Sequence, residues 1–389
     1  MTDHKLRLGV AGLGRAFVLM APGLKLHPKI ELVAAADPRA SAQLRFEADF
    51  AAKAYDSVEA LCADAAVEAI YIATPHQFHA EHVRLAADQR KHVLVEKPMA
   101  LTLDDCRAMI ECTGRASVVL VVGHSHSFDA PIQRARDLIA SGKFGPLRMI
   151  TAINFTDFLY RPRRPEELRS ETSGGVIFNQ APHHVDVARF LAGQPVRSVR
   201  AMTGAWDTER PAEGAYNCIL SFEGGAFASL TYSGYAHFDS DEFMGWIGES
   251  GYPKDQNVYG SARKLLRQAR SKDEELALKN ARNYGGETAA EIPPGGRRWH
   301  QHFGLLIASC ERADLRPMPD GVVIYGDDTR GLDPLPEPAI PRAEVIDEFY
   351  DAIFNGRPAV HDGEWGMATM EVCLAVLQSA REGREIFLR

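Results

Sequence analysis

The first forty residues hold the pattern that most restricts the fold of this chain. The apolar run LRLGVA at 6–11 predicts a short strand, and GLGRAF at 12–17 follows it with a glycine turn and the start of a helix that reaches Lys25. A second apolar run, IELVAAAD at 30–37, ends on an acid. A strand, a glycine turn, a helix, a strand and an acid in this order are typical of a dinucleotide-binding unit built on a parallel sheet.

The glycine turn assigns roles to individual residues. Gly12 permits the tight turn, and Gly14 lets backbone amides approach a pyrophosphate at the N-terminus of the helix. Arg15 and Ala16 begin that helix and are therefore expected at the cofactor as well. The third position of the GxGxxG pattern is Phe17, where glycine or alanine is usual, so the turn alone is a weak indication.

The acid at the end of the second strand strengthens the interpretation. Asp37 follows Gly12 by 25 positions (37 minus 12), where a carboxylate can accept hydrogen bonds from both ribose hydroxyls of NAD. The same charge repels a 2′-phosphate, so NAD is the expected cofactor. Arg39 stands two residues later and leaves NADP as the less favoured alternative.

Three more apolar runs extend the parallel sheet. They are AIYIATP at 69–75, HVLVEKP at 92–98 and SVVLVVGHS at 117–125. Their near-continuous apolar character is that of strands covered on both faces. In an open parallel sheet, ligands bind at the carboxyl ends of the strands. This rule places polar side chains at the site: Thr74, His76, Glu96 and Lys97 at the cofactor, and His124 and His126 at the substrate.

From residue 147 the pattern changes to short alternating strands separated by turns, which indicates an antiparallel sheet. The expected strands are 147–155, 195–204, 215–222, 226–235 and 243–248. The fold class is therefore α/β, with an N-terminal Rossmann domain and a C-terminal α+β domain on an open, mostly antiparallel sheet. We expect domains at 1–128 and 129–340, and C-terminal helices in 341–389 that pack back on the first domain. The polar stretch 254–298 predicts a helix at 261–282, as a solvated insertion or an active-site lid.

Four segments together resemble one oxidoreductase family over nearly the whole chain. They are the AGLG turn, ATPHQFH at 73–79, EKP at 96–98 and GGVIFNQAPHHVD at 174–186. The chain is similar in these to the glucose-fructose oxidoreductase, inositol dehydrogenase and MocA family. The resemblance implies that Lys97 is the catalytic lysine, supported by Glu96, and that Pro98 is a cis proline that aims it. It also implies a homo-oligomer that associates through a face of the second sheet.

The family's second catalytic segment has an aspartate, a histidine four residues on and an aspartate three beyond that. Asn179, His183 and Asp186 occupy these positions here. The resemblance gives His183 the role of a proton relay and Asp186 a place at the substrate, with His184 as a competing candidate. Asn179 can orient a hydroxyl group but cannot take a proton, so the relay rests on Lys97 and His183.

A narrower resemblance concerns the substrate. GHSHSFDAPI at 123–132, INFTDFLYRPRRPEEL at 153–168 and FGLLIASCERADLR at 303–316 look like the branch that oxidises a cis-dihydrodiol of phthalate with NAD. Such a substrate is an anionic ring compound and needs cations. The densest basic cluster is Arg161, Arg163 and Arg164, which with Tyr160 and the two histidines at 124 and 126 is expected to bind it.

Composition narrows the remaining classes. The net charge of −8 disfavours a nucleic-acid binder, and no run is apolar enough for a signal or a membrane span, so we expect no nucleic acid and no membrane partner. Six scattered cysteines without a CxxC pair favour the cytoplasm. No metal is expected, although His76, His79 and His82 are spaced by three. Two alternatives stay open: an oxidoreductase of a cyclic polyol or sugar, and a non-enzymatic NAD-binding regulator.

Overall fold

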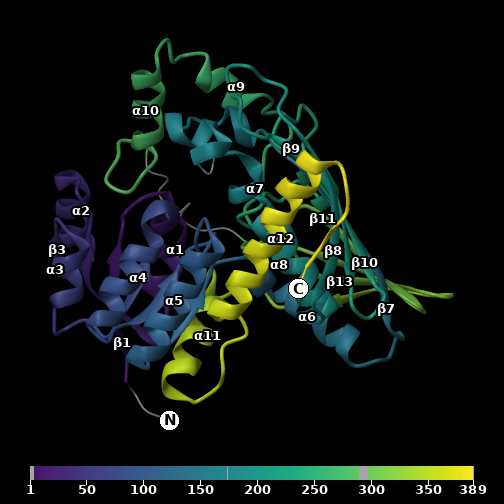
Figure 1. Ribbon diagram of the computed structural model, residues 1–389, viewed down its shortest axis with the longest axis horizontal. Helices are drawn as coiled ribbons and strands as arrows, with labels where there is room; N and C mark the ends of the chain where they lie inside the picture. Colours follow the sequence, from purple (N-terminus) through teal and green to yellow (C-terminus); the bar gives the residue numbers. More distant parts are fainter. Residues whose placement is uncertain (1–3, 173, 289–296, 389) are drawn as a thin grey trace. The chain divides into compact units, whose positions relative to one another are not determined.

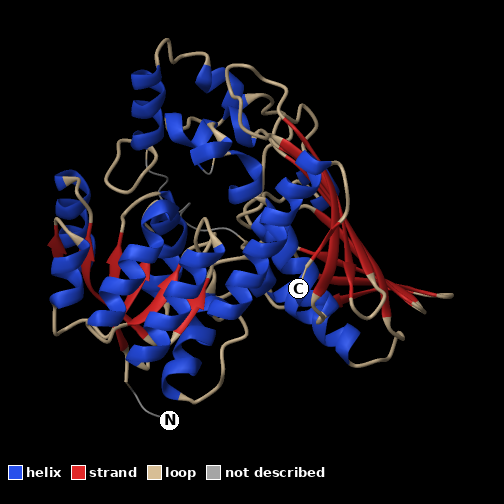
Figure 2. Cartoon of the chain, viewed as in Figure 1, coloured by secondary structure: helices blue, strands red, loops and turns tan. Residues whose placement is uncertain are grey.

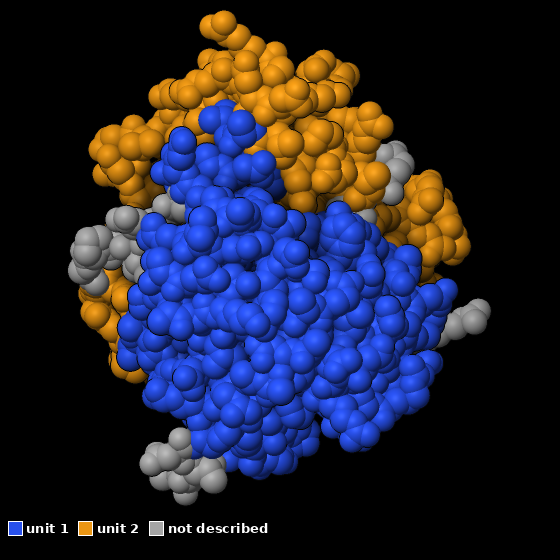
Figure 3. Space-filling model, turned by 90° about the vertical axis from the view of Figure 1, so that its left-hand side faces the viewer, with its two compact units in different colours: residues 1–124, 277–294, 339–370 blue, residues 125–276, 295–338, 371–389 orange. Residues whose placement is uncertain are grey.

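The computed structural model describes residues 4–172, 174–288 and 297–388, which form two compact units. Figure 3 colours them: residues 1–124, 277–294 and 339–370 form unit 1, and residues 125–276, 295–338 and 371–389 form unit 2. Residues 277–288 of the polar insertion are thus grouped with the nucleotide-binding unit. Residues 371–388 are grouped with the second unit, and the packing of helices from 341–389 on the first domain stays a prediction.

Unit 1 has a sheet of six parallel strands in its described residues, and this confirms the predicted Rossmann architecture. The strands are β1 (Leu6–Ala11), β2 (Ile30–Ala36), β3 (Lys53–Tyr55), β4 (Ala69–Ile72), β5 (His92–Val95) and β6 (Leu120–Val122). Their order is β3-β2-β1-β4-β5-β6, so the direction of winding reverses between β1 and β4. A ligand site is expected at such a switch point, outside the carboxyl ends of the strands.

Helices surround this sheet, as Figures 1 and 2 show. They are α1 (Arg15–Leu26), α2 (Ala40–Phe50), α3 (Val58–Ala63), α4 (His79–Asp88), α5 (Leu103–Ala116) and α11 (Ala343–Phe354). The last comes from the C-terminal part of the chain, where its apolar face buries Val345, Ile346 and Phe349. The hydroxyl of Tyr350 on the same helix donates to the carbonyl of His4 at 2.7 Å, which ties the helix to the start of β1.

Unit 2 has a nine-stranded sheet in its described residues, in the order β14-β13-β12-β11-β7-β10-β9-β8-β15. The strands are β7 (Leu147–Phe155), β8 (Val196–Gly204), β9 (Ala215–Phe222), β10 (Phe227–Ser233), β11 (Leu305–Cys310), β12 (Ala313–Met318), β13 (Gly321–Gly326), β14 (Arg330–Pro334) and β15 (Ile386–Phe387). The β7 and β10 pair is parallel, and the other pairs are antiparallel. The predicted mostly antiparallel sheet is confirmed.

Helices α6 (Ala130–Ala140) and α8 (Ala181–Ala192) pack against this sheet, through β12 and β13 for α6 and through β7 and β10 for α8. Helix α8 is buried from Ala181 to Leu191. It follows the short helix α7 (Gly175–Asn179), so the segment that resembles the family's second catalytic motif lies on two consecutive helices. Helix α12 (Gly363–Glu382) begins in unit 1, and its residues from 371 onwards are grouped with unit 2.

Two predictions about the second half of the chain are wrong. The expected strand at 243–248 is instead the end of a short 3-10 helix, Ser240–Met244, followed by two residues with positive φ. Gly245 has φ 68° and Trp246 has φ 60°, which an extended strand does not allow. The single helix expected at 261–282 is two helices, α9 (Ser261–Leu266) and α10 (Lys272–Ala281). Residues 289–296 of the proposed lid lie outside the described part of the chain.

Candidate functional site

The glycine turn of unit 1 has the geometry that a dinucleotide needs. Gly12 has φ 94°, and a Cβ there would lie 2.9 Å from the backbone of Ala73, so a side chain is excluded. A Cβ at Gly14 would meet nothing within 4 Å, so open space lies before the N-terminus of α1, where Arg15 and Ala16 form the first turn. Free space in front of helix amides is what a pyrophosphate requires, and the turn therefore fits the cofactor.

Asp37 lies directly after β2 and is 6% exposed. Its carboxylate accepts from the amide of Leu13 at 2.8 Å, which joins the end of β2 to the glycine turn. It also accepts from the guanidinium of Arg39, at 2.9 Å through Nε and at 3.0 Å through Nη2. The structure thus places the acid where a ribose is expected, and it adds a cation that already contacts it.

The residues predicted at the carboxyl ends of the strands are placed there together. Thr74 and His76 follow β4, Glu96 and Lys97 follow β5, and His124 follows β6, and these three strands are neighbours in the sheet. The Lys97–Pro98 peptide bond is cis, as the family resemblance implies. The structure also has a cis bond between Gly123 and His124, which the sequence did not predict.

Glu96 is a buried carboxyl group beside the lysine. The hydroxyl of Tyr71 donates to its Oε1 at 2.5 Å. Desolvation raises the pKa of Glu96, while Tyr71, Arg342 and Lys97 act in the opposite direction. Glu96 is therefore a poorly solvated acid held by a strand residue, and it is suited to influence the charge of Lys97 and not to exchange protons with water.

Two histidines after β4, His79 and His82, contact the loops that follow β4 and β5. His79 is buried and contacts the carbonyl oxygens of Thr74 and Pro98, each at 3.0 Å. Burial lowers the pKa of His79 to about 4, so the ring is neutral at pH 7. His82 contacts the hydroxyl of Thr74 at 2.9 Å. In the described residues no group of three or more His, Cys, Asp or Glu side chains is arranged to hold a metal ion.

In unit 2 the two candidate histidines of α8 have different surroundings. His183 Nδ1 lies 3.3 Å from the hydroxyl of Ser125, and its ring meets that of His126 edge to face at 4.8 Å between centroids. His184 Nδ1 lies 2.8 Å from the hydroxyl of Tyr216, which sits on the sheet. Burial lowers the pKa of His184 to about 3. His184 is therefore a neutral core residue, whereas His183 belongs to a polar group of side chains.

The contacts of that polar group include Ser125, Ser127 and Asp129, which the sequence did not predict as site residues. His126 Nδ1 lies 2.6 Å from the carboxylate of Asp129, and both residues are buried. The hydroxyl of Ser127 donates to the carboxylate of Asp186. Two neighbouring residues of the HSHSFD segment, His126 and Ser127, therefore each contact a carboxylate. The amide of Asn179 donates to the carbonyl of Gly175 at 2.7 Å within its own helix, so one of its groups closes the end of α7.

The three arginines of the predicted basic cluster have separate partners. Arg161 Nε donates to Asp157 at 3.0 Å, and the side chain is 35% exposed. Burial works against the charge of Arg161, but Asp157 and Glu249 raise its pKa. Arg164 faces Glu166 at 3.2 Å. The two arginines therefore have different partners. The carboxylate of Glu249 influences Arg161, whereas Arg164 pairs with a residue of its own turn.

Arg163 is the third member, and it is an interior residue of its own loop. Its guanidinium lies 3.6 Å from the centre of the Phe158 ring and donates to the Phe158 carbonyl at 2.7 Å. Desolvation lowers its pKa to about 10, and the neighbouring Arg161 acts in the same direction. Tyr160 of the same segment packs under Arg263, whose guanidinium lies 3.9 Å from the centre of its ring. Arg161 therefore differs from the other two arginines, because it pairs with Asp157 and is influenced by the carboxylate of Glu249.

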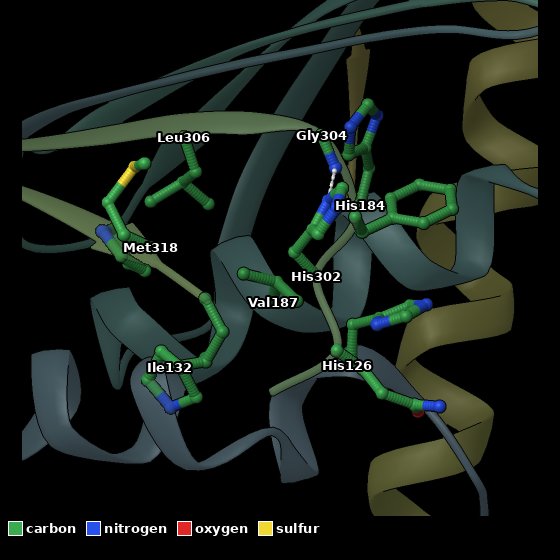
Figure 4. Close-up of a pocket in the computed structure, with 12 residues that line it drawn as sticks. His126, Ile132, His184, Val187, His302, Gly304, Leu306 and Met318 are labelled. Carbon is green, nitrogen blue, oxygen red and sulfur yellow. Dashed lines mark hydrogen bonds between the residues drawn. The ribbon is translucent and has the colours of Figure 1, made fainter. Parts of the chain in front are cut away.

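Figure 4 shows a pocket within unit 2 beside these histidines. His126, His184 and His302 lie on one side, and Ile132, Leu306 and Met318 lie on the other. The tautomer of His302 is set by the backbone, because its Nδ1 accepts from the amide of Gly304 at 3.1 Å while its Nε2 donates to the carbonyl of Ile247 at 2.8 Å. The pocket thus combines neutral or acid-paired imidazoles with an apolar wall.

Glu249 is a functional candidate that the sequence did not predict. The amide of Asn154 on β7 donates to its Oε1 at 3.0 Å. Burial alone would raise the pKa of Glu249, but Arg161, Asn154 and nearby histidines lower it overall. Glu249 follows the segment that the sequence suggested as a strand, and no motif marks it. Its neighbours are supplied by distant elements, so only the tertiary structure identifies it.

The buried histidines give a testable pH dependence. The folded-state pKa of His184, about 3, lies below the ordinary 6.5, so the unfolded chain binds more protons between these values. The stabilising contribution is therefore complete above pH 6.5 and is lost as the pH falls towards 3. We expect the wild type to lose about 2 kcal/mol more unfolding free energy than His184→Asn between pH 7.5 and 4.5 in urea titrations. His237→Asn, at an exposed position, should keep the wild-type dependence; an unchanged slope in His184→Asn would contradict the assignment.

Comparison with known proteins gives consistent results. Residues 6–124 match the GFO_IDH_MocA oxidoreductase family with an NAD-binding Rossmann fold, and residues 132–252 match the GFO/IDH/MocA C-terminal domain. The chain is 47% identical to a Comamonas testosteroni 1-carboxy-3-chloro-3,4-dihydroxycyclohexa-1,5-diene dehydrogenase, over 97% of this chain and 95% of that protein. It is 29% identical to a Thermotoga maritima myo-inositol 2-dehydrogenase, over 63% of this chain and 74% of that one.

A solved structure is similar along the whole length. It is that of a Bordetella bronchiseptica RB50 protein assigned as a dehydrogenase, with a TM-score of 0.92 and 42% sequence identity, covering 99% of this chain and all of that one. No helix in the described residues is long and apolar enough to cross a membrane.

Proposed function

The chain belongs to the GFO/IDH/MocA oxidoreductase family and is an NAD-dependent dehydrogenase, and from this premise we propose that it oxidises a cis-dihydrodiol of an aromatic carboxylic acid to the catechol. The observation that carries the proposal is the surroundings of the unit 2 histidines. Arg161 is a cation near the interior of that unit, and the pocket beside His126 has an apolar wall. A carboxylated ring with two neighbouring hydroxyl groups needs both.

NAD, when bound, supplies the hydride acceptor. The chain's own residues handle the proton and the geometry. We propose that Lys97 accepts the proton of one ring hydroxyl at Nζ as the carbinol C–H bond breaks, so that the ring loses two electrons and two hydrogens. Glu96, held by Tyr71, supports the charge that Lys97 then carries. The resulting hydroxyenone becomes a catechol by tautomerisation, and aromatisation draws the reaction forward.

The second unit orients the substrate and passes protons on. We assign the relay to His183, because Ser125 and His126 surround it with polar groups while His184 is fixed to Tyr216 in the core. Asp186 accepts a hydrogen bond from Ser127 and so holds the HSHSFD segment in place. We assign Asn179 to orienting a substrate hydroxyl group, since its amide cannot take a proton. Arg161 is assigned to the ring carboxylate, which it can bind through two parallel hydrogen bonds.

The candidate substrates differ in the number of carboxylates. The dihydrodiol of phthalate has two, and the name of the Comamonas testosteroni relative's substrate specifies one. Arg163 stacks on Phe158 and Arg164 pairs with Glu166, so Arg161 is the one arginine of this cluster that we assign to the substrate. One arginine favours a substrate with one essential carboxylate. A cyclic polyol is the alternative substrate, since the chain also aligns with an inositol dehydrogenase, but a polyol needs hydrogen-bonding partners where the pocket has an apolar wall.

The test is NADH formation by the purified protein. The panel holds the cis-dihydrodiols of benzoate and of phthalate, the same diol without a carboxylate, and a set of cyclic polyols, each with NAD and with NADP. Strong NAD reduction with the carboxylated diols alone is the expected result. Activity on polyols with none on any dihydrodiol would refute the substrate assignment and leave the dehydrogenase intact.

We also propose a homo-oligomer that associates through the outward face of the nine-stranded sheet. Met202 on β8 stands opposite Asn217, two residues from Ile219 on β9, and Phe227 on β10 stands opposite Ser221, so three large apolar side chains share one face. Met202 is 70% exposed, Ile219 46% and Phe227 43%. We expect light scattering to give a mass above 42.8 kDa, and Ile219→Asp to shift it towards the monomer. A wild-type monomer would contradict this.

The cytoplasm is the proposed location. All six cysteines are free thiols, five of them buried, as a reducing compartment allows.

A further inference from the structure

Three features of the sequence that the dehydrogenase reaction does not explain meet at one place in unit 1. Phe17 replaces the third glycine of the nucleotide turn, Arg39 follows the ribose-binding acid, and Tyr284 comes from the polar insertion about 245 positions further along the chain. The ring of Tyr284 meets the buried ring of Phe17 edge to face, at 5.0 Å between centroids. The insertion therefore contributes a side chain to the nucleotide-binding unit.

Tyr284 is anchored on α2. Its hydroxyl donates to the carboxylate of Asp49 at 2.7 Å, and Asp49 is itself paired with Arg45 at 2.7 Å. The next residue, Gly285, has φ 76°, and a Cβ there would lie 2.9 Å from Cα of Ala42. The segment therefore lies directly on the first turn of α2. In Rossmann folds this turn follows the acid that binds the adenosine ribose.

The carbonyl of Tyr284 is the partner of Arg39. Arg39 Nη1 donates to it at 3.2 Å, and Nη2 donates to the carbonyl of Leu13 at 2.8 Å. Nε and Nη2 also donate to the carboxylate of Asp37. The guanidinium is thus held at each of its nitrogens, between the glycine turn, the ribose acid and the inserted segment.

We propose that the Tyr284 segment determines cofactor specificity, by holding Arg39 against Asp37 so that this arginine does not bind a 2′-phosphate. An arginine near the ribose acid is the group that accommodates the phosphate of NADP in this fold. When ribose hydroxyls bind Asp37, they replace guanidinium hydrogen bonds on the carboxylate. The carbonyls of Tyr284 and Leu13 keep Arg39 in place, and the charge of Asp37 repels the phosphate. Tyr284 acts as a positioning residue and Arg39 as the group it restrains.

Cofactor binding without any substrate tests this, so a wrong substrate assignment does not affect the outcome. The dissociation constants of NADH and NADPH are measured by nicotinamide fluorescence for the wild type and for Tyr284→Ala. We expect the wild type to prefer NADH, and the variant to bind NADPH roughly tenfold more tightly than the wild type does, because a released arginine gains a charged hydrogen bond. NADH binding should change less than about threefold.

A double variant identifies the group responsible. In Arg39→Ala/Tyr284→Ala the gain in NADPH binding should disappear, because the cation is gone. Tyr259→Ala, an exposed tyrosine of unit 2, is the matched control and should leave both constants unchanged. Tyr284→Phe keeps the ring and loses the anchor to Asp49, and it replaces Tyr284→Ala if that variant does not fold. NADPH binding that stays constant or weakens together with NADH binding, or a gain that persists without Arg39, would overturn the proposal.

Discussion

We expect Lys97→Ala to lower kcat for the dihydrodiol by about 10³-fold, which is within the range that removal of a general base produces. The lysine is the second residue after β5 and forms the cis peptide bond with Pro98, at the edge where the parallel strands end. Loss of the proton acceptor affects the transition state, so kcat and kcat/KM should fall together. The Kd for NADH should change less than about threefold, because the turn and the ribose acid remain.

Two further variants separate proton transfer from charge. Lys97→Arg keeps a cation at the same place, but an arginine stays protonated and cannot accept the hydroxyl proton. It should therefore be nearly as inactive as the alanine variant. Lys264→Ala, at an exposed position of α9, is the matched control and should retain wild-type kcat. Near-normal turnover in a folded Lys97→Ala protein would show that this lysine is not the base.

The parts of the fold that could be predicted are those encoded locally. The strand β1 and the helix α1 follow from an apolar run and a glycine turn, and the cis bond before Pro98 followed from the family resemblance. The order of the strands then brings Thr74, Glu96 and His124 to one edge, because carboxyl ends of neighbouring parallel strands meet there. A short apolar run is less informative. FMGWIG at 243–248 is as hydrophobic as a strand, but the positive φ angle of Gly245 prevents the segment from being extended.

Side-chain partners could not be predicted, because they come from distant parts of the chain. The sequence groups three arginines within four residues, but the structure gives them different partners. Arg164 pairs with Glu166, whereas the charge of Glu249 raises the pKa of Arg161. Similarly, nothing near Tyr284 in the sequence indicates that its carbonyl holds Arg39. Such contacts depend on which loops the fold brings together, and hydrophobic periodicity carries no information on that.

The arginine assignment leads to the second large effect. We expect Arg161→Ala to raise KM for a carboxylated dihydrodiol by roughly 10- to 100-fold, since a hydrogen bond to a charged group contributes about 1.5–3 kcal/mol. The diol without a carboxylate should keep its wild-type KM. Arg164→Ala is the matched control: it removes the same charge from the same loop, but its guanidinium serves Glu166, so KM for the acid should change less than about twofold.

Comparing the KM values of the variants with both diols tests whether Arg161 binds the substrate carboxylate. Steady-state kinetics at saturating NAD, with both diols and all three proteins, gives a KM for each combination. An effect of Arg161→Ala on the acid alone identifies a carboxylate contact, because a general distortion of the loop would weaken both diols alike. Asp157 pairs with Arg161 at 3.0 Å and keeps it oriented, so Asp157→Asn should raise KM for the acid by a smaller factor. Equal losses for Arg161→Ala and Arg164→Ala, or an equal loss for the uncharged diol, would mean that the carboxylate is bound elsewhere.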